Sequence, residues 1–204
     1  MQLSLSSTPL PSRLYELRSI IEPIDLAELF PLPQPLEVEL GSGDGSFLAE
    51  YARRHPERNF IGIERLLGRL RKLDRKARRA GLANLRAIRI ESSYFLRHLL
   101  PPGSTTALHI YFPDPWPKRK HHRHRLINEG FPSIACRALA PGGAVFLRTD
   151  HPDYLDQIDF VFGQCDAFVP IETPGERLVV LTDFERAFQA QGVKTMHAGF
   201  ALRA

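Results

Sequence analysis

The feature of this sequence that most constrains its fold is a regular alternation of short buried strands and amphipathic helices. Residues 36–40 (Leu-Glu-Val-Glu-Leu) and 59–63 (Asn-Phe-Ile-Gly-Ile) both read as buried strands. Residues 46–54 predict a helix between them, and residues 66–80 predict a second helix that stops at Gly81. Strand–helix–strand order at a spacing of roughly 25 residues predicts a mostly parallel sheet with helices on both faces.

The positions of the strand ends indicate where functional residues should lie, because ligands of such sheets bind beyond the carboxyl ends of the strands. Three further strands are expected at residues 85–90, 106–112 and 144–149, and Pro-Gly-Gly at 141–143 predicts a turn before the last of them. Functional residues are therefore expected directly after residues 40, 63, 90, 112 and 149.

The 204 residues fit one domain that is preceded by a short arm. Residues 1–35 are rich in proline and leucine and predict an N-terminal arm with a helix around 14–29, whereas residues 36–204 predict a single α/β domain. A composition of 43% hydrophobic and 25% charged residues excludes wholesale disorder. The two cysteines, Cys136 and Cys165, are too few for a disulfide framework or a cysteine-based zinc site.

The sequence carries no sign of a membrane or export segment. No window has the roughly 18 consecutive apolar residues of a membrane span, and the first residues lack the charged and apolar regions of a signal peptide. We therefore expect a soluble, cytoplasmic protein with no membrane partner. No obligatory protein partner is visible, and a monomer and a homodimer fit the sequence equally well.

Positive charge is concentrated in two segments, although the net charge is only +4. Between Arg65 and Arg89 there are ten Arg or Lys residues and one acid, Asp74. Between Lys118 and Arg125 there are five more basic residues, three histidines and no acid. This asymmetry indicates a polyanionic partner such as a nucleic acid. For the 65–79 segment, a solvated helix face is the alternative interpretation.

A glycine-rich turn follows the first predicted strand, in the sequence Glu39-Leu-Gly41-Ser-Gly43-Asp-Gly45. Glycines permit a sharp turn and let the backbone approach a ligand closely. The dinucleotide fingerprint would need a glycine where Ser46 stands, so that pattern does not match. The acid-x-Gly-x-Gly-x-Gly pattern is similar to the S-adenosylmethionine loop of Rossmann-like methyltransferases. A plain tight turn between strand and helix is the alternative.

Three acids stand at the ends of three successive predicted strands: Glu39, Glu64 and Glu91. A carboxylate offers two accepting oxygens and donates nothing, so Glu64, some twenty residues after the glycines, suits the two hydroxyls of a ribose. Glu91 and Ser92 are placed to meet an adenine edge. These acids together predict a site for S-adenosylmethionine.

The fourth predicted strand runs into a proline-rich loop that carries an acid, Phe112-Pro-Asp114-Pro-Trp116-Pro. The prolines stiffen the backbone and present Asp114 at the strand tip, directly before the basic tract that starts at Lys118. The Asp-Pro-Pro-aromatic loop of DNA amino-methyltransferases is one alternative, although its spacing differs. A metal site of His121, His122 and His124 is another alternative, but no acid or cysteine accompanies them in sequence, and we predict no metal.

The proline loop and the tract after it resemble the signature of the bacterial tRNA (guanine-N7-)-methyltransferases, class I S-adenosylmethionine-dependent enzymes. The pattern Phe-Pro-Asp-Pro-Trp-Pro-Lys-x-x-His-His-x-x-Arg begins at Phe112. Gly-Ile-Glu at 62–64, Thr-Asp-His at 149–151 and Thr-Asp-Phe-Glu-Arg at 182–186 follow the family's order, so the resemblance covers roughly residues 36–192. It implies a Rossmann-like fold with a mostly parallel seven-stranded sheet, and methyl transfer to N7 of a guanine at position 46, in the variable loop of tRNA.

The resemblance also implies roles for individual residues, and Asp114 would be the catalytic one. It assigns S-adenosylmethionine binding to Glu39, Gly41, Gly43, Gly45, Glu64, Glu91, Ser92 and Asp114. It assigns substrate binding to Lys118, Asp150, Thr182, Asp183, Phe184 and Glu185. Two departures are notable: Glu91-Ser92 stands where family members often have Asp-Ala, and Asp183 places an acid inside the late motif.

The chemistry of guanine explains why such a site needs no general base. N7 already carries an in-plane lone pair, so methyl transfer depends on alignment and electrostatics. Asp114 is expected to hold the N1–H and amino edge of the guanine and to stabilise the positive charge that develops, while the basic tract holds phosphates. Trp116 either stacks on the base or anchors the proline loop. A methyltransferase for another nucleic-acid base or a small molecule, and a non-enzymatic RNA-binding relative, are the alternative functions.

Overall fold

A computed structural model describes residues 11–203 of the chain. Its strands are β1 (Leu14–Tyr15), β2 (Leu36–Leu40), β3 (Asn59–Ile63), β4 (Leu85–Ile88), β5 (Thr105–Tyr111), β6 (Leu139–Thr149), β7 (Phe168–Pro170) and β8 (Met196–Leu202). Its helices are α1 (Leu26–Leu29), α2 (Leu48–Arg54), α3 (Leu67–Arg79), α4 (Ser92–Tyr94), α5 (Phe131–Ala138), α6 (Pro152–Gly163), α7 (Gly175–Leu178) and α8 (Asp183–Ala190). A π-helical turn, Phe95–Leu99, continues α4, and a 3-10 turn spans Arg119–His124.

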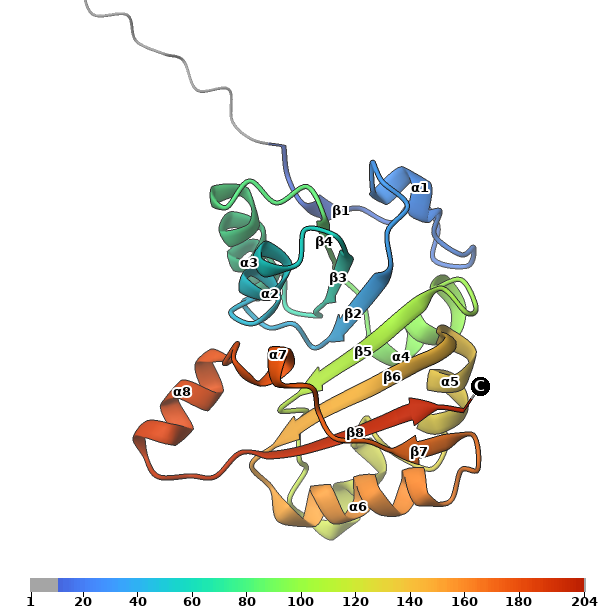
Figure 1. Cartoon of the computed structure of the whole chain (residues 1–204), viewed down its shortest axis with the longest axis vertical. Coiled ribbons are helices and arrows are strands. Elements are labelled where there is room, and N and C mark those ends of the chain that lie inside the picture. The colour runs from blue at the N-terminus through green and yellow to red at the C-terminus, as the bar shows by residue number, and fades with distance from the viewer. Residues whose placement is uncertain (1–10, 204) are drawn as a thin grey trace, which may run out of the picture.

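The strands form one sheet in the order β1-β4-β3-β2-β5-β6-β8-β7 (Figure 1). The pairs from β1 to β6 are parallel, whereas β8 runs antiparallel to both of its neighbours. The mostly parallel sheet predicted from the sequence is thus confirmed. It has eight strands rather than seven because the short strand β1, from the N-terminal segment, pairs with the edge of β4.

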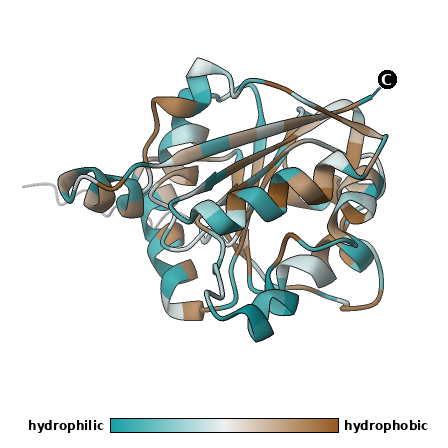
Figure 2. Cartoon of the chain, turned by 90° about the horizontal axis from the view of Figure 1, so that it is seen from below, coloured by the Kyte–Doolittle hydropathy of each residue, from teal (hydrophilic) through white to brown (hydrophobic). Residues whose placement is uncertain are grey.

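Helices cover both faces of the sheet, and each face has its own apolar core. On one face, α2 and α3 contribute Leu48, Tyr51, Leu70 and Leu73. On the other face, the segments from α4 to α6 contribute Phe95, Leu99, Phe131, Ile134, Tyr154 and Phe162. Figure 2 shows the outer helices banded in teal and brown, as expected when one side of a helix is polar and the other is apolar. None of the helices within residues 11–203 is long and apolar enough to span a bilayer.

Helix α3 has the cationic outer surface that its sequence predicts. Leu70, Leu73 and Ala77 are buried against the sheet, while the exposed positions are mainly Arg and Lys. The helix expected over residues 66–80 is one residue too long at each end, because Leu66, which is 56% exposed, and Ala80, which is also exposed, are its caps. Burial on one side therefore leaves a nearly continuous cationic face on the other.

The N-terminal segment corrects the expected helix around residues 14–29. Only Leu26–Leu29 is helical, and Asp25 caps it by accepting a hydrogen bond from the N–H of Ala27. Upstream, the Ser19 hydroxyl accepts from the N–H groups of two following residues, which forms a turn, and Pro23 cannot donate a helical hydrogen bond. Local side-chain bonding and a proline therefore override the apolar periodicity.

The Pro-Gly-Gly sequence at 141–143 also differs from the expectation of a turn that precedes a strand. Strand β6 starts earlier, at Leu139, which pairs with Thr105 of β5, and the next registered pair is Ala107 with Ala144. The residues between form a bulge, in which Gly142 has φ 74°. The glycines therefore bend a single strand rather than start it.

Candidate active site

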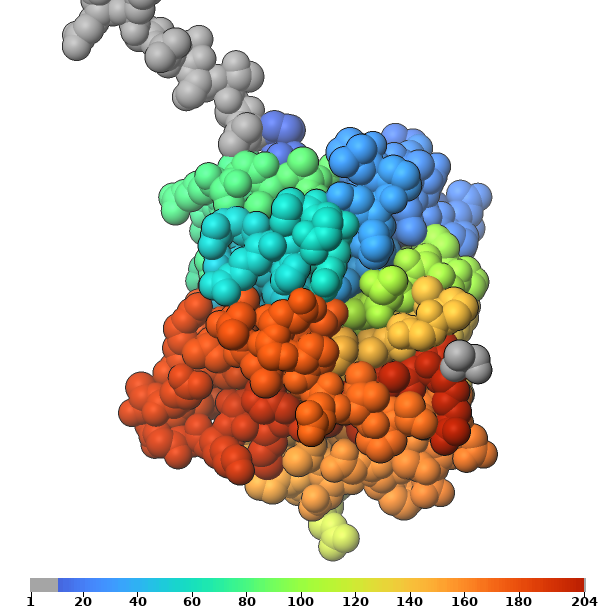
Figure 3. All heavy atoms as spheres, viewed as in Figure 1, coloured from blue at the N-terminus to red at the C-terminus, as the bar shows by residue number. Residues whose placement is uncertain are grey.

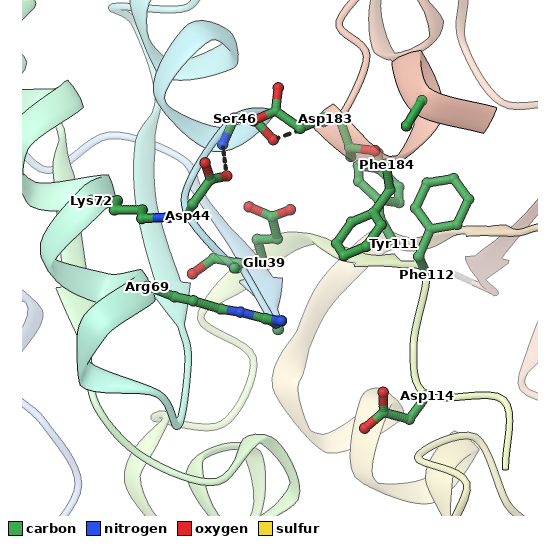
Figure 4. Close-up of a pocket in the computed structure, with 15 residues that line it drawn as sticks. Glu39, Asp44, Ser46, Arg69, Lys72, Tyr111, Phe112, Asp114, Asp183 and Phe184 are labelled. Carbon is green, nitrogen blue, oxygen red and sulfur yellow. Dashed lines mark hydrogen bonds between the residues drawn. The ribbon is translucent and has the colours of Figure 1, made fainter. Parts of the chain in front are cut away.

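A cleft opens at the carboxyl ends of β2, β3 and β5 and consists of two adjoining hollows of about 460 and 390 Å³. Cavities of this size suit small-molecule ligands. The first hollow is lined by Glu39, Gly41, Ser42, Gly43, Asp44, Ser46, Arg69, Lys72, Tyr111, Phe112, Asp114, Thr182, Asp183, Phe184 and Ala187 (Figure 4). The second hollow shares Gly41, Arg69, Tyr111, Phe112 and Asp114 with the first and adds Glu64, Glu91, Ser92 and Trp116 among others.

The glycine-rich turn forms the wall of the cleft next to β2, and its glycines serve two purposes. Gly41, Gly43 and Gly45 all have positive φ, at 80°, 55° and 75°. A Cβ on Gly45 would lie 2.2 Å from the Cδ1 atom of Leu73, so this glycine permits α3 to pack on the turn. A Cβ on Gly41 or Gly43 would meet nothing within 4 Å, so their backbone faces open space in the cleft.

Gly45→Ala should lower the free energy of unfolding by about 2–4 kcal/mol. An alanine there would have to adopt a left-handed backbone conformation, and its methyl group would collide with Leu73 in the core. Gly43→Ala is the matched control, since it has the same backbone strain without the collision. We expect it to lower stability by only about 1–2 kcal/mol. Urea titration of both variants measures the difference. Equal losses would show that the contact with Leu73 has no energetic weight.

Glu64 ties the glycine turn to the start of α3. Its Oε2 accepts a hydrogen bond of 3.1 Å from the N–H of Gly43, and its Oε1 accepts one of 2.8 Å from the N–H of Leu66. Its side chain borders the second hollow. Each oxygen retains a second lone pair, so the carboxylate still has the capacity to accept from a ligand hydroxyl.

Glu39 lies on the floor of the first hollow and is 3% exposed. Burial raises its pKa to about 8, against the lowering effect of the nearby Arg148 charge, and Asp44 and Glu64 raise it further. Its Oε2 has no hydrogen-bond partner within the described residues. An acid that is buried at the base of a cleft, with an oxygen that lacks a hydrogen-bond partner, is a strong site for a cationic group.

Glu91 is placed beside the second hollow, but its carboxylate already serves the chain. It caps α4 by accepting hydrogen bonds of 2.9 and 2.7 Å from the N–H groups of Ser93 and Tyr94. Ser92, next to it, also borders the hollow. The predicted contact of Glu91 with an adenine would therefore have to share the carboxylate with the helix N-terminus.

The proline-rich loop holds Asp114 at the junction of the two hollows, and Figure 4 shows its carboxylate on the side of the cleft opposite the glycine turn. Phe112 and Trp116, on either side of it, have φ values of 53° and 43°. Residues other than glycine rarely adopt this left-handed region, and such strain is concentrated at functional sites. The loop is therefore held in one unusual conformation.

Arg125 provides much of that support, which corrects the expectation that the whole 118–125 tract faces phosphates. Its side chain is 1% exposed and donates a hydrogen bond of 2.7 Å to the carbonyl of Pro115. It also donates to Gln157, forms an ion pair with Asp153 and lies 4.7 Å from the ring centroid of Tyr154. Arg125 thus fastens the loop from behind, while Lys118, Arg119, Lys120 and Arg123 remain exposed.

Trp116 is 39% exposed and packs against two histidines of the tract. Its ring centroid lies 5.9 Å from that of His121 and 5.2 Å from that of His124. Within residues 11–203, no three His, Cys, Asp or Glu side chains are grouped so that they could hold a metal ion. The histidines therefore support the indole, and the exposed part of Trp116 borders the second hollow.

In the late motif, Glu185 faces the interior, whereas Thr182, Asp183 and Phe184 line the first hollow. Thr182 and Glu185 form a capping box at the start of α8, in which each side chain accepts a hydrogen bond from the backbone of the other. Glu185 is also 1% exposed and ion-paired with Arg148. Asp183 and Phe184 instead border the first hollow (Figure 4). Thr182 also lines the first hollow, so its predicted substrate contact stays a prediction, whereas Glu185 is turned away from the cleft toward Arg148.

The remaining predicted substrate residues lie farther from the cleft. Lys118 is exposed at the end of the proline loop, and Asp150 is half-buried directly after β6, bordering neither hollow. Three further residues line the cleft that were not expected there from the sequence: Arg69, Lys72 and Tyr111. The spacing of Arg69 and Lys72, three residues apart on one helix, places both on the same side and was the available signal.

Comparison with known proteins places the chain among methyltransferases. A family model described as "Putative methyltransferase" matches residues 33–198. The chain is 42% identical, over 65% of its length, to the tRNA (guanine-N(7)-)-methyltransferase of Nitrosomonas eutropha, of which it covers 59%. It is 37% identical, over 83% of its length, to the tRNA (guanine-N(7)-)-methyltransferase of Nitrosococcus oceani, of which it covers 72%. The first of these matches thus spans less than two thirds of the curated relative.

The fold also has solved counterparts. The crystal structure of the 16S rRNA methyltransferase KamB superposes with a TM-score of 0.66, and the alignment covers 90% of this chain and 95% of that chain. The two sequences are 17% identical, so this likeness concerns the fold alone.

Proposed function

Since this chain belongs to the tRNA (guanine-N7-)-methyltransferase family, we propose that it transfers a methyl group from S-adenosyl-L-methionine to N7 of a guanine in the tRNA variable loop, at position 46. The observation that carries the proposal is the position of Asp114, which borders both hollows of the cleft and lies on the loop that leads into the exposed basic tract. Residues 36–204 would form the methyltransferase domain and residues 1–35 an arm.

The cleft fits S-adenosylmethionine by the chemistry of its walls. The carboxylate of Glu39, whose Oε2 has no partner within the described residues, suits a cationic amino-acid portion. The open backbone of Gly41 and Gly43 permits close approach. Glu64 would accept from the ribose, and Ser92 would face the adenine side. When bound, this cofactor supplies a methyl group on a positively charged sulfonium.

The residues around Asp114 would position the guanine. Its carboxylate would accept from the N1–H and amino groups of the base and stabilise the positive charge that develops on the purine. Phe184 is 54% exposed at the cleft, with its ring centroid 6.3 Å from that of Phe112, so the two rings offer an apolar wall for an unstacked base. These side chains align and stabilise, and none is required to remove a proton.

The outer face of α3 and the exposed part of the basic tract would hold RNA phosphates. Arg71, Arg75 and Arg79 are exposed and form no ion pair with any side chain of residues 11–203. Lys118, Arg119 and Lys120 are likewise exposed. Such contacts fix the orientation of the RNA without reading its sequence.

Cofactor binding should release a proton near neutral pH. Glu39 is largely protonated below its raised pKa of about 8, and a cationic ligand beside it favours the ionised form. Affinity should therefore rise with pH up to about 8, by at most tenfold per unit. Calorimetry at pH 7 in buffers of different ionisation enthalpy should detect release that approaches one proton, which Glu39→Gln should abolish. If Glu39→Gln released as many protons as wild type, the proton would come from another group.

The raised pKa of Glu39 also makes the stability of the unliganded protein depend on pH, in the direction opposite to that of cofactor affinity. Because the folded state keeps the Glu39 proton that the unfolded chain loses near pH 4.5, this group makes stability fall as pH rises from about 4.5 to 8. Cofactor affinity and stability of the unliganded protein should thus change in opposite directions across this range.

The proposed function is tested by incubation with labelled S-adenosylmethionine and unmodified tRNA, followed by chemical cleavage at 7-methylguanosine. Cleavage at one variable-loop guanine is the expected result. Transfer to DNA or to a small molecule, but not to tRNA, would identify a different methyltransferase. Binding of RNA with no cofactor binding in calorimetry would identify a non-enzymatic relative.

A further inference from the structure

A single arginine lies beneath the segment that closes one side of the cleft. Arg148, near the end of β6, is 1% exposed, and its guanidinium lies 4.0 Å from the ring centroid of Tyr111. Its Nη1 donates to the carbonyl of Val180 at 3.0 Å and pairs with the carboxylate of Glu185. Its Nη2 donates to the carbonyl of Arg177. One side chain of the sheet thus binds three points of the segment from α7 to α8.

The first turn of α8 depends on the same contacts. The Oε2 atom of Glu185 that meets Arg148 also accepts from the N–H of Thr182, at 3.1 Å. The N–H of Asp183 donates to the hydroxyl of Ser46 in the glycine turn, at 3.0 Å. Figure 4 shows Asp183 and Phe184 on the side of the cleft opposite Lys72 and Arg69, and Figure 3 shows the α7–α8 segment packed against the surface next to α2. Arg148 therefore fixes the wall that carries these two residues.

Because both side chains are buried, Arg148 and Glu185 each depend on the other as a charge partner. Glu185 cannot reach a ligand in the cleft without leaving the interior and leaving Arg148 without its carboxylate partner. A buried charge that loses its partner is strongly unfavourable. Asp183 and Phe184 of the same turn are exposed and line the cleft, and Thr182 beside them also borders it.

We propose that Arg148 is a positioning residue for the methyl transfer, and that Glu185 acts through it rather than by touching the RNA. The ion pair holds the first turn of α8 so that Phe184 and Asp183 face the target nucleotide. This inference rests on the proposed function for its substrate, whereas the anchoring of α8 is measurable without tRNA.

The first test compares hydrogen exchange in Arg148→Met and Arg148→Lys with wild type. Arg148→Met should accelerate amide exchange in residues 175–190 by at least about tenfold and leave α3 unchanged, because the α7–α8 segment loses its three contacts with Arg148. In Arg148→Lys, which retains the charge, the exchange rate of these amides should lie between the rates of wild type and of Arg148→Met. Arg137→Met is the matched control, since Arg137 donates to the carbonyls of Leu96 and Leu100 on the opposite face. Unchanged exchange in 175–190 of Arg148→Met would overturn the proposal.

The second test is a double-mutant cycle on steady-state constants for tRNA. Glu185→Gln retains an acceptor for the capping box but removes the charge that Arg148 needs. Arg148→Met and Glu185→Gln should each raise the KM for tRNA about tenfold, with kcat within about threefold of wild type. Glu185→Gln should also leave the Kd for S-adenosylhomocysteine within about threefold, because it leaves the Arg148 charge beside Glu39 in place. The double variant should have the KM of the worse single variant, because both changes break one interaction.

Multiplication of the two effects, to about a hundredfold rise in KM, would show that Glu185 contacts the RNA independently and would overturn the proposal. If wild type binds S-adenosylhomocysteine but methylates no tRNA, the proposed function fails, and hydrogen exchange still decides whether Arg148 anchors α8. Arg148→Lys keeps both tests available should Arg148→Met fail to fold.

Discussion

Asp114→Asn should slow methyl transfer by roughly 10²–10³-fold at saturating tRNA and cofactor, which is the usual loss for one preorganised electrostatic contact. The substitution keeps the shape of the side chain but removes the negative charge that would face the developing positive charge on guanine. The fold should be unaffected, because the Asp114 carboxylate accepts no hydrogen bond from the described residues and the loop is held through the carbonyl of Pro115. Single-turnover kinetics with labelled cofactor measures the effect.

Asp156→Asn is the matched control, since it makes the same charge change at an exposed position of α6 that borders neither hollow. It should turn over at the wild-type rate. Some loss of cofactor affinity is compatible with the assignment of Asp114, which borders both hollows. A near wild-type rate for Asp114→Asn would leave this residue as a loop-shaping one and remove it from catalysis.

Simultaneous replacement of Arg71, Arg75 and Arg79 by Gln should flatten the salt dependence of tRNA binding by about 2 log units per log unit of salt. These residues are four apart and form one exposed stripe on α3. Each phosphate contact contributes about 0.7–0.9 to the slope, because it releases condensed counterions. Binding measured between low and moderate salt gives the slope directly.

Arg53→Gln/Arg54→Gln on α2 is the control, because both arginines are already paired with Glu50. It should leave the slope nearly unchanged. Calorimetry with S-adenosylhomocysteine should show that the stripe variant retains its cofactor affinity, since none of the three arginines borders the cleft. An unchanged slope in the stripe variant would mean that α3 is a solvated face and that phosphates bind at the exposed part of the 118–125 tract.

The central strands were predictable from the sequence because both of their sides are buried. Strands β2 and β3 begin and end at the residues expected from their apolar runs, and α3 follows its apolar periodicity apart from its two capping residues, Leu66 and Ala80. The N-terminal segment was not predictable in this way. There, a serine turn, a proline and pairing with the edge of β4 determine the structure, and edge pairing leaves no local pattern in the sequence.

The acids of the cleft were predictable as a group, but the use of each carboxylate was not. Glu39, Glu64 and Glu91 all border the cleft, but the carboxylates of Glu64 and Glu91 also accept hydrogen bonds from backbone N–H groups. The carboxylate of Glu185 instead meets Arg148. In the sequence, a glutamate that caps a helix looks the same as one that binds a ligand, because both follow a buried strand. The Thr-x-x-Glu spacing of the late motif was a readable signal of a capping box. The buried partner Arg148 lies 37 positions away from Glu185 and had no such signal.

The split within the 118–125 tract has a consequence for engineering the substrate range. Arg125 fastens the loop of Asp114 from inside the molecule, whereas Lys118, Arg119, Lys120 and Arg123 project outward. The residue that supports the loop and the residues that face solvent are therefore neighbours in sequence but lie on different sides of the tract. The outward positions can therefore be randomised in a selection for other RNA acceptors with Arg125 held constant, and we expect the loop that carries Asp114 to keep its conformation in such a library.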